Sequence, residues 1–154
     1  MKKITIQDIK NFKNSSNQFA TLTAYDFVSA QILDEANIPL ILVGDSASMT
    51  VYGYNTTVPI TMDEMILVVK AVCRGVSSSL VVADMPFLSY QPSLEETIKN
   101  AGLLIKKGGA SAVKIEGGIS VSQHIKSLVD FGIPVLGHVG LTPQSYHQLS
   151  GYSI

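Results

Sequence analysis

The sequence predicts an α/β fold, in which a parallel sheet is built from repeated strand–helix units. Short apolar runs rich in β-branched residues alternate with helical patterns. The runs are continuously apolar instead of alternating, which is typical of strands buried on both faces. The predicted strands cover residues 19–24, 40–43, 80–83, 112–115 and 133–137.

Signals for helix starts and ends separate these strands. Residues 61–64 and 93–96 each begin with a hydroxyl residue and end with a glutamate, which is the spacing of a capping box. Residues 106–109 read Lys-Lys-Gly-Gly and are typical of a helix end, where cations and a left-handed glycine are favoured. A further short helix is expected over residues 6–12. Ser77–Ser79 is interpreted as a polar turn.

The order of elements favours a parallel sheet with right-handed crossovers. Two folds fit this order: an open doubly wound sheet, or a (β/α)₈ barrel that is cut short. Five strands fit in 154 residues, whereas a full barrel needs eight strands and about 250 residues. No Gly-x-Gly-x-x-Gly motif follows the first strand, so nothing supports a dinucleotide-binding fold.

Composition excludes several classes of protein. Apolar residues make up 46% of the chain and charged residues 15%, so we expect a substantial core. The net charge of −1 gives no reason to expect binding to nucleic acid or to a membrane surface. Lys2 and Lys3 are followed by polar residues, and the longest apolar runs are too short to span a bilayer. Cys73 is the only cysteine, and we interpret it as a small buried side chain in a reduced, cytoplasmic protein.

Ionisable residues mark the ends of four successive predicted strands. Asp45, Asp84, Glu116 and His138 each stand at or just after the end of an apolar run. Because ligands bind at the carboxyl ends of parallel strands, we expect these four side chains to face one cavity. Any one of the acids alone is more often a helix cap, and a lone histidine is more often structural. Four consecutive strands that end in this way are harder to explain by capping.

Three crowded carboxylates repel one another unless a cation lies between them. Oxygen ligands without cysteine indicate a hard ion, Mg²⁺ or Mn²⁺. We therefore predict Asp45 and Asp84 as metal ligands, with Glu116 holding a coordinated water. Lys114 lies on the same face of its strand as Glu116, where neighbouring carboxylates would keep it cationic; a plain ion pair is the alternative.

Several long motifs, in the right order, resemble ketopantoate hydroxymethyltransferases, and the resemblance runs from about residue 4 to Tyr152. These motifs are Gly44-Asp45-Ser46, Met49-Thr50-Val51, Gly53-Tyr54-Asn55-Thr56-Thr57, Val82-Ala83-Asp84-Met85-Pro86-Phe87, Val113-Lys114-Ile115-Glu116-Gly117-Gly118 and Gly137-His138-Val139-Gly140-Leu141-Thr142-Pro143-Gln144-Ser145. One departure is Ala47-Ser48, where the family usually has Leu-Gly.

The resemblance implies a Mg²⁺-dependent (β/α)₈ TIM barrel of the phosphoenolpyruvate/pyruvate type, here truncated to about five βα units in one partial domain over residues 1–154. The family transfers a hydroxymethyl group from 5,10-methylenetetrahydrofolate to 3-methyl-2-oxobutanoate, giving 2-dehydropantoate for coenzyme A. It also implies that Asp45, Asp84 and Glu116 serve the metal, that Ser46, Lys114 and His138 bind the keto acid, and that full-length members form homo-oligomers.

Two alternatives remain open from the sequence. In the family the general base is a glutamate on a later strand, so no catalytic base is expected within residues 1–154. The chain could therefore be a non-catalytic fragment that acts, if at all, by pairing with another chain. It could also be another Mg²⁺-dependent keto-acid carbon–carbon lyase of the same barrel type.

Overall fold

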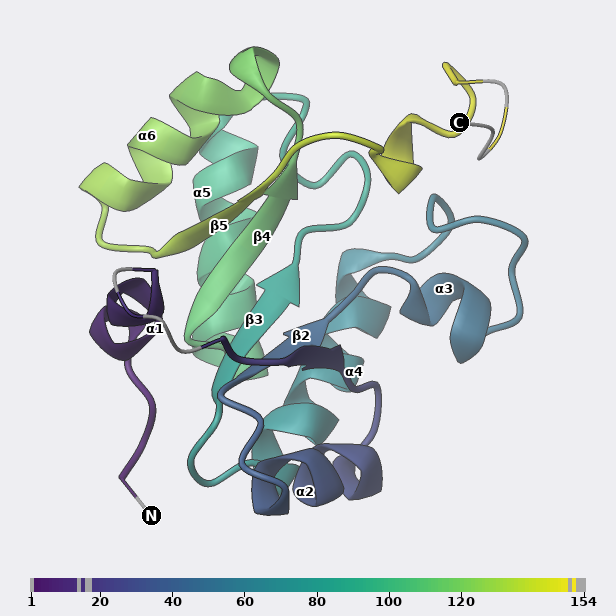
Figure 1. Ribbon diagram of the computed structural model, residues 1–154. Helices are drawn as coiled ribbons and strands as arrows, with labels where there is room; N and C mark the ends of the chain where they lie inside the picture. Colours follow the sequence, from purple (N-terminus) through teal and green to yellow (C-terminus); the bar gives the residue numbers. More distant parts are fainter. Residues whose placement is uncertain (1, 14, 16–17, 150, 152–154) are drawn as a thin grey trace.

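The computed structural model describes residues 2–13, 15, 18–149 and 151. Residues 150 and 152, at the end of the motif resemblance, lie outside the described residues. Five parallel strands form one sheet, and they are ordered in the sheet as they are in the chain (Figure 1). The strands are β1 (Thr21–Thr23), β2 (Leu40–Val43), β3 (Leu80–Asp84), β4 (Ala112–Glu116) and β5 (Val135–His138).

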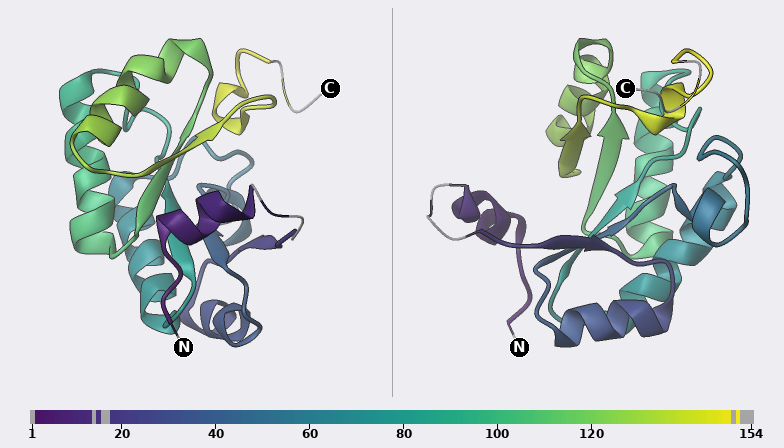
Figure 2. Two further views of the ribbon diagram at one scale, coloured as in Figure 1. Left: turned by 60° about the vertical axis from the view of Figure 1, so that its left-hand side comes forward. Right: turned by 45° about the vertical axis from the view of Figure 1, so that its right-hand side comes forward.

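Helices follow the strands in turn, and most of them lie on one side of the sheet (Figure 2). They are α1 (Ile6–Phe12), α2 (Phe27–Glu35), α3 (Ala47–Thr50), α4 (Met62–Gly75), α5 (Leu94–Leu103) with the π-helical turn η1 (Leu104–Gly108), the 3₁₀ turn η2 (Ile119–Val121), α6 (Ser122–Asp130) and the 3₁₀ turn η3 (Pro143–Ser145). The expected short helix over residues 6–12 is confirmed as α1.

The sheet order decides between the two folds that the sequence left open. In a doubly wound sheet the strand order reverses at a switch point, and helices cover both faces. Here β1 to β5 follow one another without reversal, and α2, α4, α5 and α6 lie on the same side. Consecutive βα units arranged in this way are the building pattern of a barrel.

Strand alternation divides the core into two parts. Val81 and Ala83 of β3 belong to the main core, which they share with the helices, whereas Leu80 and Val82 point to the opposite, inner face of the sheet. On that inner face, Ile6 and Ile9 of α1 pack against the strand residues. The same alternation places the last residue of β3 on the inner face.

The structure confirms the predicted burial of both faces for the central strands β3 and β4. For the outer strands β1 and β5 this prediction is wrong. Every residue of β3 and β4 is buried, whereas all three residues of β1 are exposed and β5 has no buried residue. An outer strand has a hydrogen-bonded neighbour on one side only. Its apolar sequence therefore does not ensure burial.

The predicted strand limits need small corrections. The structure confirms residues 40–43 as β2, but β1 is shorter than residues 19–24, and β5 begins two residues later than predicted. Strands β3, β4 and β5 each extend by one residue, to Asp84, Glu116 and His138. These extensions arise because Asp84 pairs with Lys114 and Glu116 pairs with His138 across neighbouring strands.

The helix signals are confirmed with one correction. Thr61 and Glu64 form a complete capping box at the start of α4. Ser93 caps α5 by accepting a hydrogen bond from the Glu96 amide, but the Glu96 carboxylate instead contacts Lys99 and Asn100. Gly109, at φ 91°, ends η1 in the left-handed conformation that a glycine adopts easily.

The serine turn before β3 binds the carboxylate of Asp34. The main-chain amides of Ser77, Ser78 and Ser79 and the hydroxyls of Ser78 and Ser79 all donate to Asp34, over distances of 2.7–3.2 Å. Burial opposes ionisation, but these hydrogen bonds hold the pKa of Asp34 well below its usual value. The turn is therefore an anion-binding element that ties α2 to the start of β3, and the interpretation as a simple polar turn was incomplete.

Within the described residues, no helix combines the length and apolar character required to cross a membrane. Burial raises the pKa of the Cys73 thiol to about 11. A thiol with such a pKa is almost fully protonated at neutral pH. Cys73 packs against the main core as expected, but it is only partly buried, not buried as predicted.

Candidate active site

Two neighbouring strands bring three charged side chains together on the inner face of the sheet. Asp84 ends β3, while Lys114 and Glu116 lie two residues apart on β4 and so share a face. Asp84 and Lys114 are register partners. All three residues are buried, so water does not screen their charges and neighbouring charged groups must balance them.

Lys114 lies between two carboxylates. Its Nζ is 2.8 Å and 2.7 Å from the two oxygens of Asp84, and 3.3 Å from Oε1 of Glu116. Burial alone would lower the pKa of Lys114, but the negative charges of Asp84 and Glu116 outweigh it and raise that pKa. Lys114 therefore stays cationic in the buried site.

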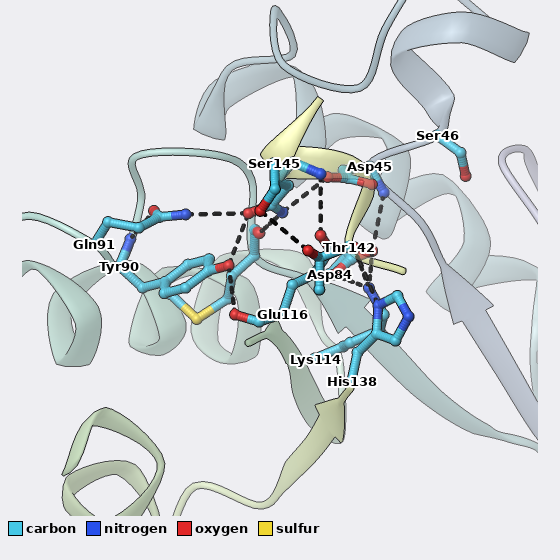
Figure 3. A network of polar contacts seen from close by, with 12 residues as sticks. Asp45, Ser46, Asp84, Tyr90, Gln91, Lys114, Glu116, His138, Thr142 and Ser145 are labelled. Atoms are coloured by element: carbon cyan, nitrogen blue, oxygen red, sulfur yellow. Dashed lines mark hydrogen bonds and ion pairs between the residues drawn. The ribbon is translucent and has the colours of Figure 1, made fainter. Parts of the chain in front are cut away.

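Asp45 completes the cluster from the loop between β2 and α3. Its main-chain amide donates to Oδ2 of Asp84 at 3.3 Å. Asp45, Asp84 and Glu116 each offer a carboxylate oxygen within 4.8 Å of the other two, and all three residues are buried (Figure 3). A single small cation could contact all three groups.

Without a cation, burial and mutual repulsion disfavour the ionised form of these carboxylates. Burial, together with the charge of Asp84, raises the pKa of Asp45 to about 7. Burial also raises the pKa of Asp84, to about 6, although Lys114 opposes this shift. When all three carboxylates are ionised, one ammonium group leaves two negative charges unbalanced. A divalent cation would neutralise them.

His138 and Ser46 lie at the margin of the cluster. The Nδ1 atom of His138 is 3.2 Å from Oε1 of Glu116, and about a third of the histidine side chain is exposed, 31%. Ser46 follows Asp45 in the chain, but its hydroxyl lies 2.8 Å from the Tyr25 hydroxyl. Figure 3 shows Ser46 apart from the carboxylates. The structure thus gathers Asp45, Asp84, Lys114, Glu116 and His138 and leaves Ser46 beside them.

A buried glutamine, Gln144 in η3, was not assigned a role from the sequence. Its amide nitrogen donates to Oδ2 of Asp45 at 2.9 Å, and its main-chain amide donates to Oε2 of Glu116 at 3.1 Å. Tyr90 and Gln91 contact its amide oxygen. The sequence carried one signal for it, its position inside the family motif that begins at Gly137.

Comparison with known proteins shows the family to which this chain belongs. The family model described as ketopantoate hydroxymethyltransferase matches residues 3–154. This chain belongs to that family. A 3-methyl-2-oxobutanoate hydroxymethyltransferase of Dehalococcoides mccartyi is 53% identical over 150 residues, which are 97% of this chain and 54% of the relative. Its counterpart from Carboxydothermus hydrogenoformans is 50% identical over 154 residues, 100% of this chain and 56% of the relative. This chain therefore spans about half the length of these curated hydroxymethyltransferases.

Solved structures support the fold of this hydroxymethyltransferase family member. A 2,3-dimethylmalate lyase, described as a member of the PEP mutase/isocitrate lyase superfamily, matches with a TM-score of 0.65 and 14% identity, over 89% of this chain and 52% of that one. A phosphonopyruvate hydrolase, solved as a complex with oxalate and Mg²⁺, matches with a TM-score of 0.57 and 18% identity, over 75% of this chain and 39% of that one. The described residues thus have the fold of part of a barrel of this type: four βα units followed by the strand β5, one helix fewer than the five units expected.

Proposed function

We propose that this chain carries the metal- and keto-acid-binding part of a 3-methyl-2-oxobutanoate hydroxymethyltransferase. The reaction transfers a hydroxymethyl group from 5,10-methylenetetrahydrofolate to 3-methyl-2-oxobutanoate and gives 2-dehydropantoate, a precursor of pantothenate and coenzyme A. The name of relatives 50–53% identical to this chain supports the proposal. The observation that carries it is the buried group of Asp45, Asp84 and Glu116, with Lys114 against two of its members.

The residues present fit a magnesium ion. Their donor atoms are carboxylate oxygens, which Mg²⁺ prefers, and the site contains no cysteine. Asp45 and Asp84 would hold the ion directly, and Glu116 would support it through a coordinated water. When bound, Mg²⁺ would act as a Lewis acid towards the carboxylate and keto oxygens of the substrate.

The remaining polar residues would bind and orient the keto acid. Lys114 favours the ionised form of Asp84, against the effect of burial, and places a positive charge on the inner face of the sheet. His138, at the partly exposed edge of the site, and Ser46, next to Asp45, would donate hydrogen bonds to the substrate. Proton removal from C3 of the substrate would require a general base.

Further assignments belong to the same proposal. Residues 1–154 would form one partial-barrel domain of a cytoplasmic enzyme that assembles as a homo-oligomer. Its partners would be the small keto acid and the folate carrier, without nucleic acid or membrane.

A thermal melt tests the proposal directly. Because a ligand that binds only the folded state stabilises it, millimolar Mg²⁺ together with 2-dehydropantoate should raise the melting temperature of this chain. At a ligand concentration of 100 times Kd, the gain is about 2.7 kcal/mol. Asp84→Asn should abolish the increase, whereas Asp63→Asn, a matched change of an exposed aspartate on α4, should retain it. An equal increase in both variants, or none in the unsubstituted chain, would contradict the proposal.

One experiment separates this function from that of a carbon–carbon lyase on the same fold. Because ligand binding needs no general base, 3-methyl-2-oxobutanoate with Mg²⁺ should raise the melting temperature of this chain if it belongs to a transferase. If it belongs to a lyase, a substituted malate such as 2,3-dimethylmalate should raise the melting temperature instead. The lyases match at 14–15% identity and support the fold alone.

A further inference from the structure

We infer that Gln144 is a positioning residue of the metal site, which sets the orientation of Asp45 and Glu116. The inference rests on the proposed function, because it concerns the same carboxylates. Gln144 belongs to the short turn η3, which follows β5, and it is 99 residues from Asp45 along the chain. Its side chain is nevertheless buried against the site, with 5% of the residue exposed.

Every hydrogen-bonding position of the Gln144 amide is occupied. The nitrogen donates to Oδ2 of Asp45 at 2.9 Å and to the Met85 carbonyl oxygen at 2.8 Å. The oxygen accepts from Nε2 of Gln91 at 3.2 Å and lies 2.7 Å from the Tyr90 hydroxyl. A glutamine amide has two donor hydrogens and two acceptor lone pairs, so these four partners use its full capacity.

The partners also determine which way the amide faces. A main-chain carbonyl oxygen can only accept, so the nitrogen of Gln144 must face Met85. A reversed amide would place its oxygen against the Met85 carbonyl and the Asp45 carboxylate. The Tyr90 hydroxyl has a single hydrogen and lies near both Oε1 of Gln144 and the Glu116 carbonyl oxygen at 3.0 Å, so Met85 and Asp45, and not Tyr90, determine this orientation.

The same residue holds a second carboxylate through its main chain. The amide of Gln144 donates to Oε2 of Glu116 at 3.1 Å, whereas Lys114 and His138 contact the other oxygen, Oε1. Gln144 therefore binds one defined oxygen of Asp45 and one of Glu116. Because a carboxylate is planar, fixing one oxygen sets the direction in which the second can bind a ligand.

Groups that orient metal ligands in this way have a measurable effect on the metal. Loss of such a partner typically weakens metal binding about 10–100-fold. Gln144→Leu keeps the side chain at a similar size but removes both donors. We expect it to weaken binding of Mn²⁺ to the folded chain about 10–100-fold.

Mn²⁺ alone is the probe, since the EPR signal of the free ion reports its binding without any substrate. Gln148→Leu is the matched control, because Gln148 lies exposed on the same segment; it should bind Mn²⁺ within about twofold of the unsubstituted chain. Gln91→Leu changes an exposed residue that supports the amide, and it should weaken binding by a smaller factor. This variant keeps the test informative if Gln144→Leu does not fold, as checked by far-UV circular dichroism.

The outcomes separate this inference from the function on which it rests. If Gln144→Leu lowers the melting temperature but leaves the Mn²⁺ dissociation constant unchanged, Gln144 has a structural role only and the inference is overturned. If Gln144→Leu is unfolded and Gln91→Leu binds Mn²⁺ as the unsubstituted chain does, it is overturned as well. If the unsubstituted chain does not bind Mn²⁺, the metal site fails first, and the proposed function with it.

Discussion

Lys114 and Asp84 are paired in register on β4 and β3, and the ammonium group of Lys114 lies 2.8 Å and 2.7 Å from the two oxygens of Asp84. The side chains of both residues are almost completely buried, with 9% and 3% exposed. The ammonium group of Lys114 offsets part of the charge of Asp84 and Glu116, the two carboxylates on the inner face of the sheet. We therefore expect Lys114 to be important for folding, in addition to its proposed role in binding the substrate.

Lys114→Met should destabilise the metal-free chain markedly. Removal of one partner from a buried ion pair leaves the other charge without compensation, which costs about 3–5 kcal/mol. Urea denaturation at pH 7.5 in the presence of EDTA would measure this loss. Lys126→Met is the control, because Lys126 forms an exposed pair with Asp130 and should cost less than about 1 kcal/mol. Equal losses in the two variants would show that the Lys114 contacts do not support the fold.

Stability of the metal-free chain should fall as pH rises from about 4 to 7. The pKa of Asp45 is raised from 3.8 to about 7, chiefly by burial and then by the charge of Asp84. In this interval the folded state therefore binds more protons than the unfolded state, so a higher pH favours unfolding. One pKa unit corresponds to about 1.4 kcal/mol, so the change should amount to a few kcal/mol.

Urea denaturation in EDTA at several pH values between about 4 and 7 would measure this dependence. Asp45→Asn should remove much of the slope, because asparagine does not titrate. The attribution of this pH dependence to Asp45 is wrong if the free energy of unfolding rises across this range. It is also wrong if Asp45→Asn leaves the pH dependence of the free energy of unfolding unchanged.

Asp34→Ala should destabilise the chain without affecting metal binding. The substitution leaves the buried amides of Ser78 and Ser79 without their acceptor, at a cost of about 1–3 kcal/mol for each unsatisfied group. Although burial opposes it, hydrogen bonding lowers the pKa of Asp34, so its contribution should be complete above about pH 4 and lost at lower pH. Asp130→Ala, which changes an exposed aspartate on α6, should have little effect on unfolding by urea. An equally small effect for Asp34→Ala would contradict the anchoring role of this carboxylate.

Two helical glycines should respond to alanine in opposite directions. A Cβ atom at Gly75 would overlap the Phe27 carbonyl oxygen and would lie 3.1 Å from the Cβ of Ala30, so α2 and α4 would have to separate. Gly75→Ala should therefore cost about 1–3 kcal/mol. Gly102 in α5 has no atom within 4 Å of the same position, and Gly102→Ala should stabilise the chain by about 0.5–1 kcal/mol. Melting temperatures that shift in the same direction for both variants would show that the contact between α2 and α4 does not restrict position 75.

The strand ends illustrate what periodicity can predict. A parallel sheet brings the carboxyl ends of its strands together, so an ionisable residue at the end of each apolar run was enough to group Asp84, Glu116 and His138. Strand alternation likewise placed Lys114 beside Glu116. Burial of β1 and β5 was predicted wrongly, because exposure of an outer strand depends on what lies next to it and not on its own residues.

The family follows from motifs in the amino-acid sequence that resemble those of its members. The order of strands and helices and the carboxylates that gather at one end of the sheet also follow from the sequence. These features depend on local spacing and on backbone rules that any parallel sheet obeys. Only the folded chain reveals that Gln144 contacts Asp45, and that Asp34 binds the serine turn 43–45 residues further along the chain. Such contacts depend on side-chain directions and distances between separately packed segments, which no local pattern in the chain encodes.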